Sequence, residues 1–174
     1  MHEFTDLADR STSYVLGVLN ETADRIGAQL ETSSATHHIK NLQMIQMHKA
    51  IMAVGLFSLF EAVLQDGLEV EHGFREADAV LAALGDADLA LRFRQYRLAV
   101  NVLKHGRGKS YDALAAKISD LPFRMKGPDE AFFEGDVSEV STLIEVDDAF
   151  VSACADLVRE VSAVLRAARP EAVF

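Results

Sequence analysis

Hydrophobic residues recur at intervals of three and four along most of the chain, which is the spacing of one face of an α-helix. The pattern predicts helices over residues 4–31, 37–68, 74–84 and 147–169, a short helix over 111–118, and a helix that follows Asp86 and ends at Gly106. Residues 50–64 are apolar nearly all round, so the 37–68 helix is expected to be central. We predict an all-α, up-and-down bundle of four to five main helices in one domain spanning residues 1–174.

Polar residues at the predicted helix ends indicate where the helices begin. Asp86, Thr36 and Ser110 each precede a helical pattern and carry the side-chain oxygens that cap helix N-termini. Gly106 suits the left-handed conformation that ends a helix.

Residues 119–146 lose the helical period and form an irregular acidic insertion before the last helix. Eight acids and no Lys or Arg lie between Asp129 and Asp148. Residues 131–134 and 141–146 are aromatic and β-branched around a glycine, which favours a small β-hairpin. A long irregular segment of this kind is typical of a functional or partner-binding region. The alternative interpretation is a solvated acidic loop without a function of its own.

Charge is distributed unevenly along these 174 residues. The chain has 27 Asp and Glu against 17 Lys and Arg, a net charge of −10, which argues against a broad nucleic-acid surface. Six of the cations nevertheless lie between Leu91 and Tyr111, where there is no acid: Arg92, Arg94, Arg97, Lys104, Arg107 and Lys109. We expect this basic element to be the functional part of the chain. One interpretation of the charge pattern is that the basic element contacts the acidic insertion, either within one chain or across two chains.

Glu61 is the one carboxylate in the apolar 50–64 stretch. An unpaired carboxylate there costs several kcal/mol in rough terms, so we expect either an exit to solvent or a pairing with a cation of residues 92–109.

The chain contains a single cysteine, Cys154, and no segment that reads as a signal peptide. One cysteine allows no internal disulfide, which favours a reducing compartment. The 50–64 stretch is shorter than the roughly 20 residues that span a bilayer. We expect a cytoplasmic protein with no membrane partner.

Sequence signatures of cofactor and metal chemistry are absent. There is no P-loop, dinucleotide-binding, HExxH or CxxC motif. His37 and His38 are adjacent and point to different sides of a helix, so they make a poor chelating pair. We expect no metal and no cofactor. The segment Gly106-Arg107-Gly108-Lys109-Ser110 could wrap a phosphate through backbone N–H groups and two cations.

Arg97, Asn101 and His105 are spaced four apart and therefore lie on one stripe of the basic helix. These three are the candidate catalytic residues, and Arg94, Lys104, Arg107 and Lys109 are the candidate anion-binding residues. The alternative, purely structural interpretation is that His105 is a cation at the C-terminus of the helix, beside a glycine cap, where the helix dipole favours positive charge.

A long apolar helix bearing Leu59-Phe60-Glu61-Ala62, followed by a helix that ends Asn101-Val102-Leu103-Lys104-His105-Gly106, resembles the HEPN superfamily. The resemblance covers roughly residues 4–118 and the last helix. It implies an up-and-down helical bundle, often a homodimer. Many members are metal-independent RNases of toxin–antitoxin and defence systems, and others are inactive binding or partner domains.

The family's catalytic motif is an arginine, four to six residues, then a histidine, often with a polar residue directly after the arginine. His105 matches the histidine and Asn101 the polar residue, but Val100 stands where the arginine would be. The nearest upstream arginine, Arg97, lies roughly 12 Å from His105 along a helix axis, against roughly 7.5 Å for the tightest family spacing. Arg107 could substitute from the loop.

In an active site of this family, His105 would act on the RNA 2′-hydroxyl or the leaving oxygen, while an arginine would stabilise the phosphate. With the arginine displaced, we predict a HEPN-like domain that binds RNA, nucleotide or an antitoxin-type protein partner with weak or no catalysis. One alternative is a metal-independent endoribonuclease that uses His105. Another is a structural helical interaction protein.

Overall fold

The computed structural model describes residues 4–32 and 35–172, and over these ranges the protein is all-helical, which confirms the prediction that the chain is all-α. The helices of the described chain are α1 (Phe4–Leu30), α2 (Thr36–Gly67), α3 (Gly73–Leu84), α4 (Ala87–His105), α5 (Lys109–Ala115), the 3₁₀ helix η1 (Ile118–Asp120) and α6 (Asp148–Ala168).

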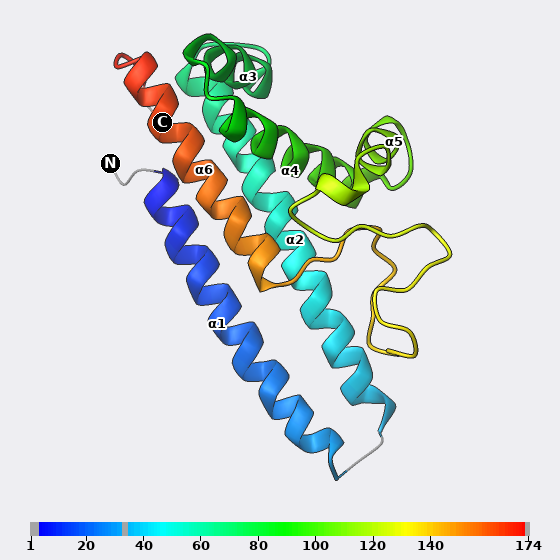
Figure 1. Cartoon of the computed structure of the whole chain (residues 1–174). Helices are drawn as coiled ribbons and strands as arrows, with labels where there is room; N and C mark the ends of the chain where they lie inside the picture. Colours follow the sequence, from blue (N-terminus) through cyan, green and yellow to red (C-terminus); the bar gives the residue numbers. More distant parts are fainter. Residues whose placement is uncertain (1–3, 33–34, 173–174) are drawn as a thin grey trace.

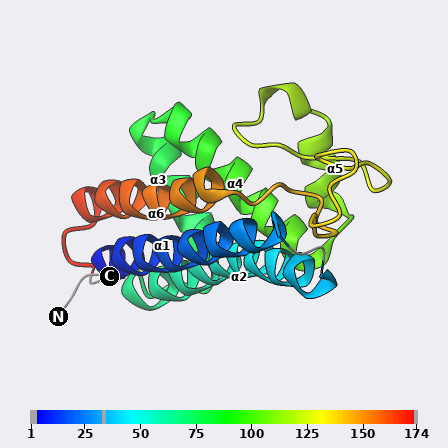
Figure 2. The same cartoon turned by 90° about the horizontal axis from the view of Figure 1, so that it is seen from below.

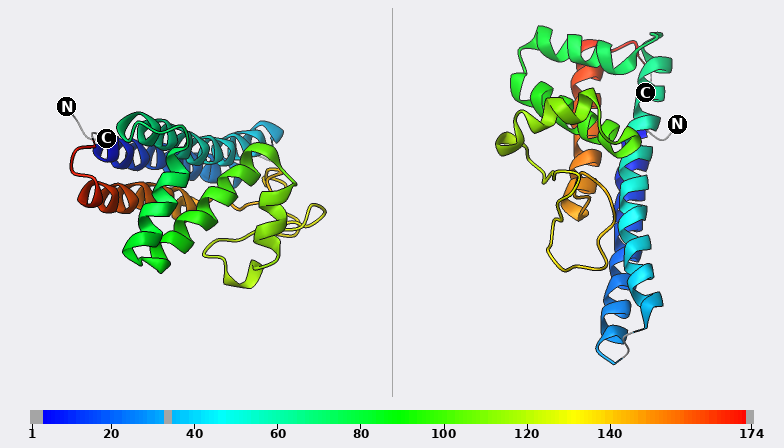
Figure 3. Two further views of the ribbon diagram at one scale, coloured as in Figure 1. Left: turned by 90° about the horizontal axis from the view of Figure 1, so that it is seen from above. Right: turned by 90° about the vertical axis from the view of Figure 1, so that its right-hand side faces the viewer.

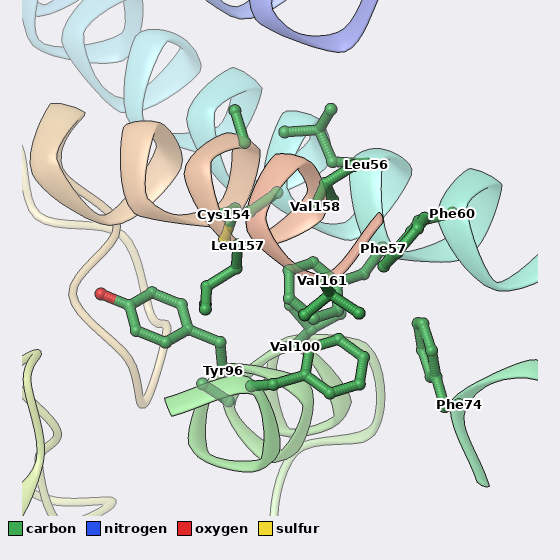
Figure 4. Close-up of a cluster of buried hydrophobic side chains, with 14 of the residues drawn as sticks. Leu56, Phe57, Phe60, Phe74, Tyr96, Val100, Cys154, Leu157, Val158 and Val161 are labelled. Carbon is green, nitrogen blue, oxygen red and sulfur yellow. The ribbon is translucent and has the colours of Figure 1, made fainter. Parts of the chain in front are cut away.

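Three long helices, α1, α2 and α6, run side by side, and each packs against the other two (Figure 1). The shorter helices α3 and α4 pack against both α2 and α6, and α5 packs against α4 (Figure 2). The main hydrophobic core lies where α2, α4 and α6 meet (Figure 4). Its largest fully buried side chains include Phe57, Phe60, Phe93 and Phe150.

Two of the predicted helix ends are confirmed at the level of single contacts. The Asp86 carboxylate accepts a hydrogen bond from the Leu89 amide at 3.2 Å, so it caps α4 as expected. Helix α4 ends before Gly106 as predicted, and Gly106 has a positive φ of +70°, which favours glycine. Its ψ of −138° shows that it does not adopt the left-handed helical conformation that was expected.

The predicted caps at Thr36 and Ser110 are wrong. The cap positions of α2 and α5 are Ala35 and Gly108, and neither makes a side-chain cap hydrogen bond. Both helices begin earlier than predicted, so Thr36 and Ser110 lie inside them. Gly108 has a φ of +155°, which lets the chain turn directly from α4 into α5.

The hairpin of α1 and α2 projects beyond the start of α6 (Figure 3). The first residue of α6, Asp148, forms an ion pair with Lys49 of α2 at 2.6 Å and accepts a hydrogen bond from Asn20 of α1. Beyond these contacts a second, smaller hydrophobic cluster holds the two helices together around Leu19, Ile26 and Ile45. Within the described chain, the hairpin is therefore an arm of two helices that has no third helix along its outer half.

Helix α2 is long and apolar enough, by length and composition, to cross a membrane. The sequence-based expectation had considered residues 50–64 alone, which are too few to span a bilayer. Core helices of soluble proteins meet the same criterion. In α2 one side is fully buried, at Ala53, Phe57 and Phe60.

The acidic insertion does not contain the predicted hairpin among its described residues. Ile144 instead pairs in an antiparallel bridge with Met125, and the Glu145 amide donates to the Arg124 carbonyl at 3.1 Å. Residues 131–134 are held differently, since the Phe132 and Phe133 amides both donate to the carboxylate of Glu139.

Two acids of the insertion pair with cations of the same segment. Glu139 binds Lys126, and Glu145 binds Arg124. Within the described residues, no acid of 129–148 pairs with a cation of 91–111, so the expected contact between basic helix and acidic segment is not formed inside one chain. The insertion packs instead beside α2, where Gln43 donates to the Val137 carbonyl.

Candidate functional site

Helix α4 buries one side and exposes the other. Phe93, Tyr96 and Val100 lie in the core, so the residues on the opposite side face outward. The outward side is the polar and basic one. Its members are Arg94, Arg97, Asn101, Lys104 and His105, whose spacings place them along one stripe of the helix.

A depression of about 290 Å³ opens beside this stripe. Three helices contribute its walls: α2, the first turn of α3 with the residue before it, and α4. We call it the α2–α3–α4 depression, and its polar lining consists of Ser58, Glu61, His72, Arg75, Arg97, Asn101 and Lys104. Of the predicted site residues it therefore contains Arg97, Asn101, Lys104 and Glu61.

Gly73 determines how closely α3 approaches α2. A Cβ atom at this position would lie 2.7 Å from the Leu64 Cβ and 2.8 Å from the Glu61 carbonyl oxygen, which is closer than real Cβ atoms come. Glycine therefore allows the start of α3 to rest on the backbone of α2. This contact brings the neighbouring His72 and Arg75 to the rim of the depression.

Arg97 is held in a fixed position on the wall of the depression. Its guanidinium forms an ion pair with Asp78 of α3 at 2.7 Å and donates to the Phe74 carbonyl at 3.3 Å. It also lies 5.8 Å from the ring centre of Phe74 and 5.7 Å from that of Phe93. Because these contacts already restrict the Arg97 side chain, that side chain would lose less conformational entropy when it binds a ligand.

Most of the other basic residues of this region have no carboxylate partner. Over the ranges 4–32 and 35–172, Arg75, Arg94, Lys104, Arg107 and Lys109 form no ion pair. Their positive charge is available to an anion.

Arg92 behaves differently from these cations. It binds Glu160 of α6 at 2.7 Å and Asp88 at 3.0 Å, and the hydrogen bond with Glu160 is the main reason that the pKa of Arg92 is raised. Arg92 therefore ties α4 to α6 rather than serving the depression.

Glu61 is half-buried on the α2 wall of the depression. It shares the depression with Arg97 and Lys104, but it forms no ion pair within 4.0 Å with any described residue. The structure therefore places Glu61 close to the basic helix without the direct pairing that the sequence analysis considered.

His105 lies at the exposed end of α4 and is not part of the lining of the depression. The stripe of α4 joins it to Arg97 and Asn101, but only those two face the hollow. Val100, which stands where the HEPN motif that the sequence resembles has an arginine, is 3% exposed and points into the hydrophobic cluster (Figure 4). An arginine at position 100 would have to leave the core, so the valine fits this packing.

Three lining residues were missed by the sequence analysis: Ser58, His72 and Arg75. They come from α2 and from the start of α3, outside the basic segment. Gly73 between His72 and Phe74 is the one local signal for the close approach that brings them in.

The loop between α4 and α5 carries the remaining predicted residues. Arg107 and Lys109 are exposed, and Gly106 and Gly108 both have positive φ. The loop lies next to the end of the basic stripe but does not line the depression.

Outside the depression, the described residues offer neither a reactive cysteine nor a cluster of metal ligands. Cys154 is fully buried, and burial raises the pKa of its thiol, so it is not a reactive thiolate. Among the residues that the structure describes, no three His, Cys, Asp or Glu side chains gather as metal ligands would.

Comparisons with protein-family models, with curated proteins and with solved structures gave no match.

Proposed function

We propose that this protein is a HEPN-like domain that binds RNA or a nucleotide through the α2–α3–α4 depression and the adjoining basic stripe of α4. One observation carries the proposal: on an acidic chain, two cations that are unpaired within the described residues, Arg75 and Lys104, stand with the fixed Arg97 around one hollow. A phosphate group is the ligand that such a set of donors recognises best.

The remaining lining residues suit the sugar and base of a nucleotide. Asn101 can donate and accept hydrogen bonds, and Ser58 offers a hydroxyl. The Glu61 carboxylate accepts hydrogen bonds, as a ribose hydroxyl or a base amino group would provide. The volume of about 290 Å³ lies just below the range for small-molecule sites, roughly 300–1,000 Å³. One nucleotide of a strand is therefore the unit we propose for the depression.

Weak or absent catalysis is part of the proposal. The position of the family's arginine is the buried Val100, and His105 lies outside the hollow that holds Arg97. From the resemblance we further propose an up-and-down bundle, a cytoplasmic location, a homodimer, and a toxin–antitoxin or defence setting with an antitoxin-type protein partner.

A metal-independent endoribonuclease is the second candidate function. It is favoured by the exposure of His105, which stands on the same stripe as Arg97 and Asn101. In that case His105 would exchange the proton and a basic side chain would stabilise the phosphate. The purely structural interpretation, in which the basic helix meets its own chain's acidic segment, has no ion pair in the described residues to support it.

Binding of a labelled single-stranded RNA, followed by fluorescence anisotropy at increasing salt, tests the proposed function. Contacts with several phosphates predict an affinity that falls steeply as salt rises. An affinity that does not change with salt would argue against phosphate recognition.

A further inference from the structure

A second pocket, of about 310 Å³, lies between α4, the chain that follows η1 and the start of α6. It shares no residue with the α2–α3–α4 depression, and its volume falls within the range of small-molecule sites, roughly 300–1,000 Å³. We call it the Tyr96 pocket. Its aromatic and charged lining consists of Tyr96, Phe123, Arg124, Glu145, Asp147 and Phe150.

The acidic insertion forms one side of this pocket. The Glu145 amide donates to the Arg124 carbonyl at 3.1 Å, and the Lys126 amide donates to the Leu143 carbonyl at 3.0 Å. These hydrogen bonds hold the chain after η1 against the chain before α6. The Arg124 guanidinium and the Glu145 carboxylate, 3.1 Å apart, add an ion pair between the same two segments. The insertion therefore builds a defined wall beside the hydrophobic core.

Three aromatic rings form the apolar part of the pocket. The ring of Tyr96 lies 5.1 Å from that of Phe123 and 5.0 Å from that of Phe150, and the two phenylalanine rings are 5.4 Å apart. Tyr96 and Phe150 are almost fully buried, whereas Phe123 is half-buried. Part of the Phe123 ring is therefore open to the pocket, where a flat ligand ring can pack against it.

The Tyr96 hydroxyl is a buried polar group without a partner. Tyr96 is 5% exposed, and its hydroxyl makes no hydrogen bond with the described residues, whereas the Tyr111 hydroxyl donates to the Lys126 carbonyl. Figure 4 shows the Tyr96 hydroxyl pointing away from the other labelled side chains. Buried hydroxyls in proteins are normally hydrogen-bonded, so this one is suited to a ligand in the pocket that it lines.

Asp147 offers a carboxylate to the same pocket. Its Oδ1 accepts a hydrogen bond from the Phe150 amide at 2.8 Å, and it forms no ion pair with the residues that the structure describes. Its Oδ2 is therefore available to an N–H group. Burial, with smaller contributions from the charges of Cys154 and Asp147, raises the pKa of Tyr96 to about 12, so the hydroxyl stays protonated and can donate near neutral pH.

We propose that the Tyr96 pocket binds a free purine base or nucleoside that carries an amino group. The Watson–Crick edge of such a base places an N–H donor beside an acceptor. Asp147 accepts from the donor, the Tyr96 hydroxyl donates to the acceptor, and the purine ring packs against Phe123.

The charge of the pocket favours a free base over a nucleotide of a strand. Glu145 and Asp147 supply two negative charges against one positive charge from Arg124. The phosphates of a strand would meet these carboxylates, whereas a neutral purine would not. The proposal is therefore independent of phosphate recognition in the α2–α3–α4 depression.

Calorimetric titration of the full-length protein with adenosine and with guanosine tests this proposal. At least one of the two should bind saturably, and purine riboside, whose base has no N–H group, should bind roughly tenfold more weakly. Tyr96→Phe should weaken nucleoside binding by a similar factor without lowering the thermal stability of the ligand-free protein, because the hydroxyl bonds to no described residue. Asp147→Asn, which keeps an oxygen to cap α6, should also weaken binding.

Tyr111→Phe is the matched control, since Tyr111 does not line the pocket, and it should leave nucleoside binding unchanged. The proposal would be overturned if neither nucleoside bound, if purine riboside bound equally well, or if Tyr96→Phe had no effect. Loss of nucleoside binding in Arg75→Glu/Lys104→Glu would also overturn it, because the nucleoside would then occupy the depression. Single-stranded RNA affinity should be the same in Tyr96→Phe as in the wild type, and a joint loss would assign the pocket to a base of the strand instead.

Discussion

The guanidinium of Arg97 and the carboxylate of Asp78 lie 2.7 Å apart and join α4 to α3. The ion pair fixes the cation at the wall of the depression, and it also offsets part of the positive charge there. The two residues therefore determine both the geometry and the charge of the candidate site.

Asp78→Asn should separate these two effects. The variant keeps the shape of the side chain but leaves the Arg97 charge uncompensated, so we expect the affinity for single-stranded RNA to rise a few-fold. The folded state should lose about 1 kcal/mol, since the pair is partly exposed. Anisotropy and urea unfolding measure the two quantities, and an unchanged or weaker affinity would contradict the assigned role of Arg97.

Gly73→Ala should destabilise the protein and disturb the depression. The added methyl group would meet the backbone of α2 at Glu61, so we expect a loss of about 1–3 kcal/mol in the free energy of unfolding.

Gly27→Ala is the matched control for that substitution. Its methyl group would meet nothing within 4 Å on α1, so the better helix propensity of alanine should add about 0.5–1 kcal/mol of stability. Equal effects of the two substitutions in denaturant unfolding would show that α3 does not depend on this close approach.

The Lys126–Glu139 pair should hold the acidic insertion in place. Both side chains are nearly buried, at 10% and 12% exposure. Glu139→Gln would leave a buried ammonium without its partner, and we expect a loss of roughly 2 kcal/mol in unfolding free energy. The double substitution Lys126→Met with Glu139→Gln removes the unpaired ammonium and keeps an oxygen acceptor for the Phe132 and Phe133 amides, so it should recover most of that loss. A double variant that is less stable than Glu139→Gln would contradict this account.

Acid should weaken the same region. Burial acts to raise the pKa of Glu139, but the hydrogen bonds from Lys126 and from the Phe132 and Phe133 amides outweigh it, and the net pKa is lowered. A carboxylate with a lowered folded-state pKa contributes stability above the ordinary glutamate pKa of about 4.3, and that stability is lost as pH falls through the lowered value. Urea unfolding between about pH 3 and pH 6 should show this loss, and Glu139→Gln should reduce it. An identical pH profile in the variant would exclude Glu139 as its source.

RNA cleavage without added metal distinguishes the two candidate functions. The binding proposal predicts no cleavage above background by the wild type, because the buried Val100 stands where the HEPN motif has its arginine. Cleavage that disappears in His105→Ala would establish the endoribonuclease alternative instead. His72→Ala is the comparison, since a loss confined to that variant would move the chemistry into the depression.

The helices were predictable from the sequence because their signal is local. The apolar period, the Asp86 cap and the Gly106 stop each depend on residues within a turn of one another, and α4 begins and ends as predicted. The caps at Thr36 and Ser110 were wrong because both helices begin earlier than their apolar periods, α2 at Thr36 itself and α5 directly after Gly108.

The acidic insertion was not predictable because its contacts join distant residues. Its form depends on Glu139 reaching Lys126 and two backbone amides, and on Gln43 reaching Val137 from another part of the chain. Periodicity and β-propensity contain none of this information.

The candidate site was found in part. Arg97, Asn101 and Lys104 share a helix, so their spacing placed them together. His72 and Arg75 join them only through the packing of α3 on α2 at Gly73, a tertiary contact. His105 and Asn101 have the spacing of the histidine and the polar residue of the HEPN motif, without its arginine, but the structure places His105 outside the depression.

The central claim is that the α2–α3–α4 depression binds the phosphates of RNA. The most direct measurement compares the affinity for single-stranded RNA, and its salt dependence, among three proteins. They are the wild type, the depression double variant Arg75→Glu/Lys104→Glu, and the control double variant Arg10→Glu/Arg25→Glu. The control changes the net charge by the same amount, but on α1. In the depression variant only, we predict an affinity at least about tenfold weaker and a shallower salt slope, by roughly 0.7 for each phosphate that the protein no longer neutralises. Equal weakening in both double variants, or none in either, would contradict the claim.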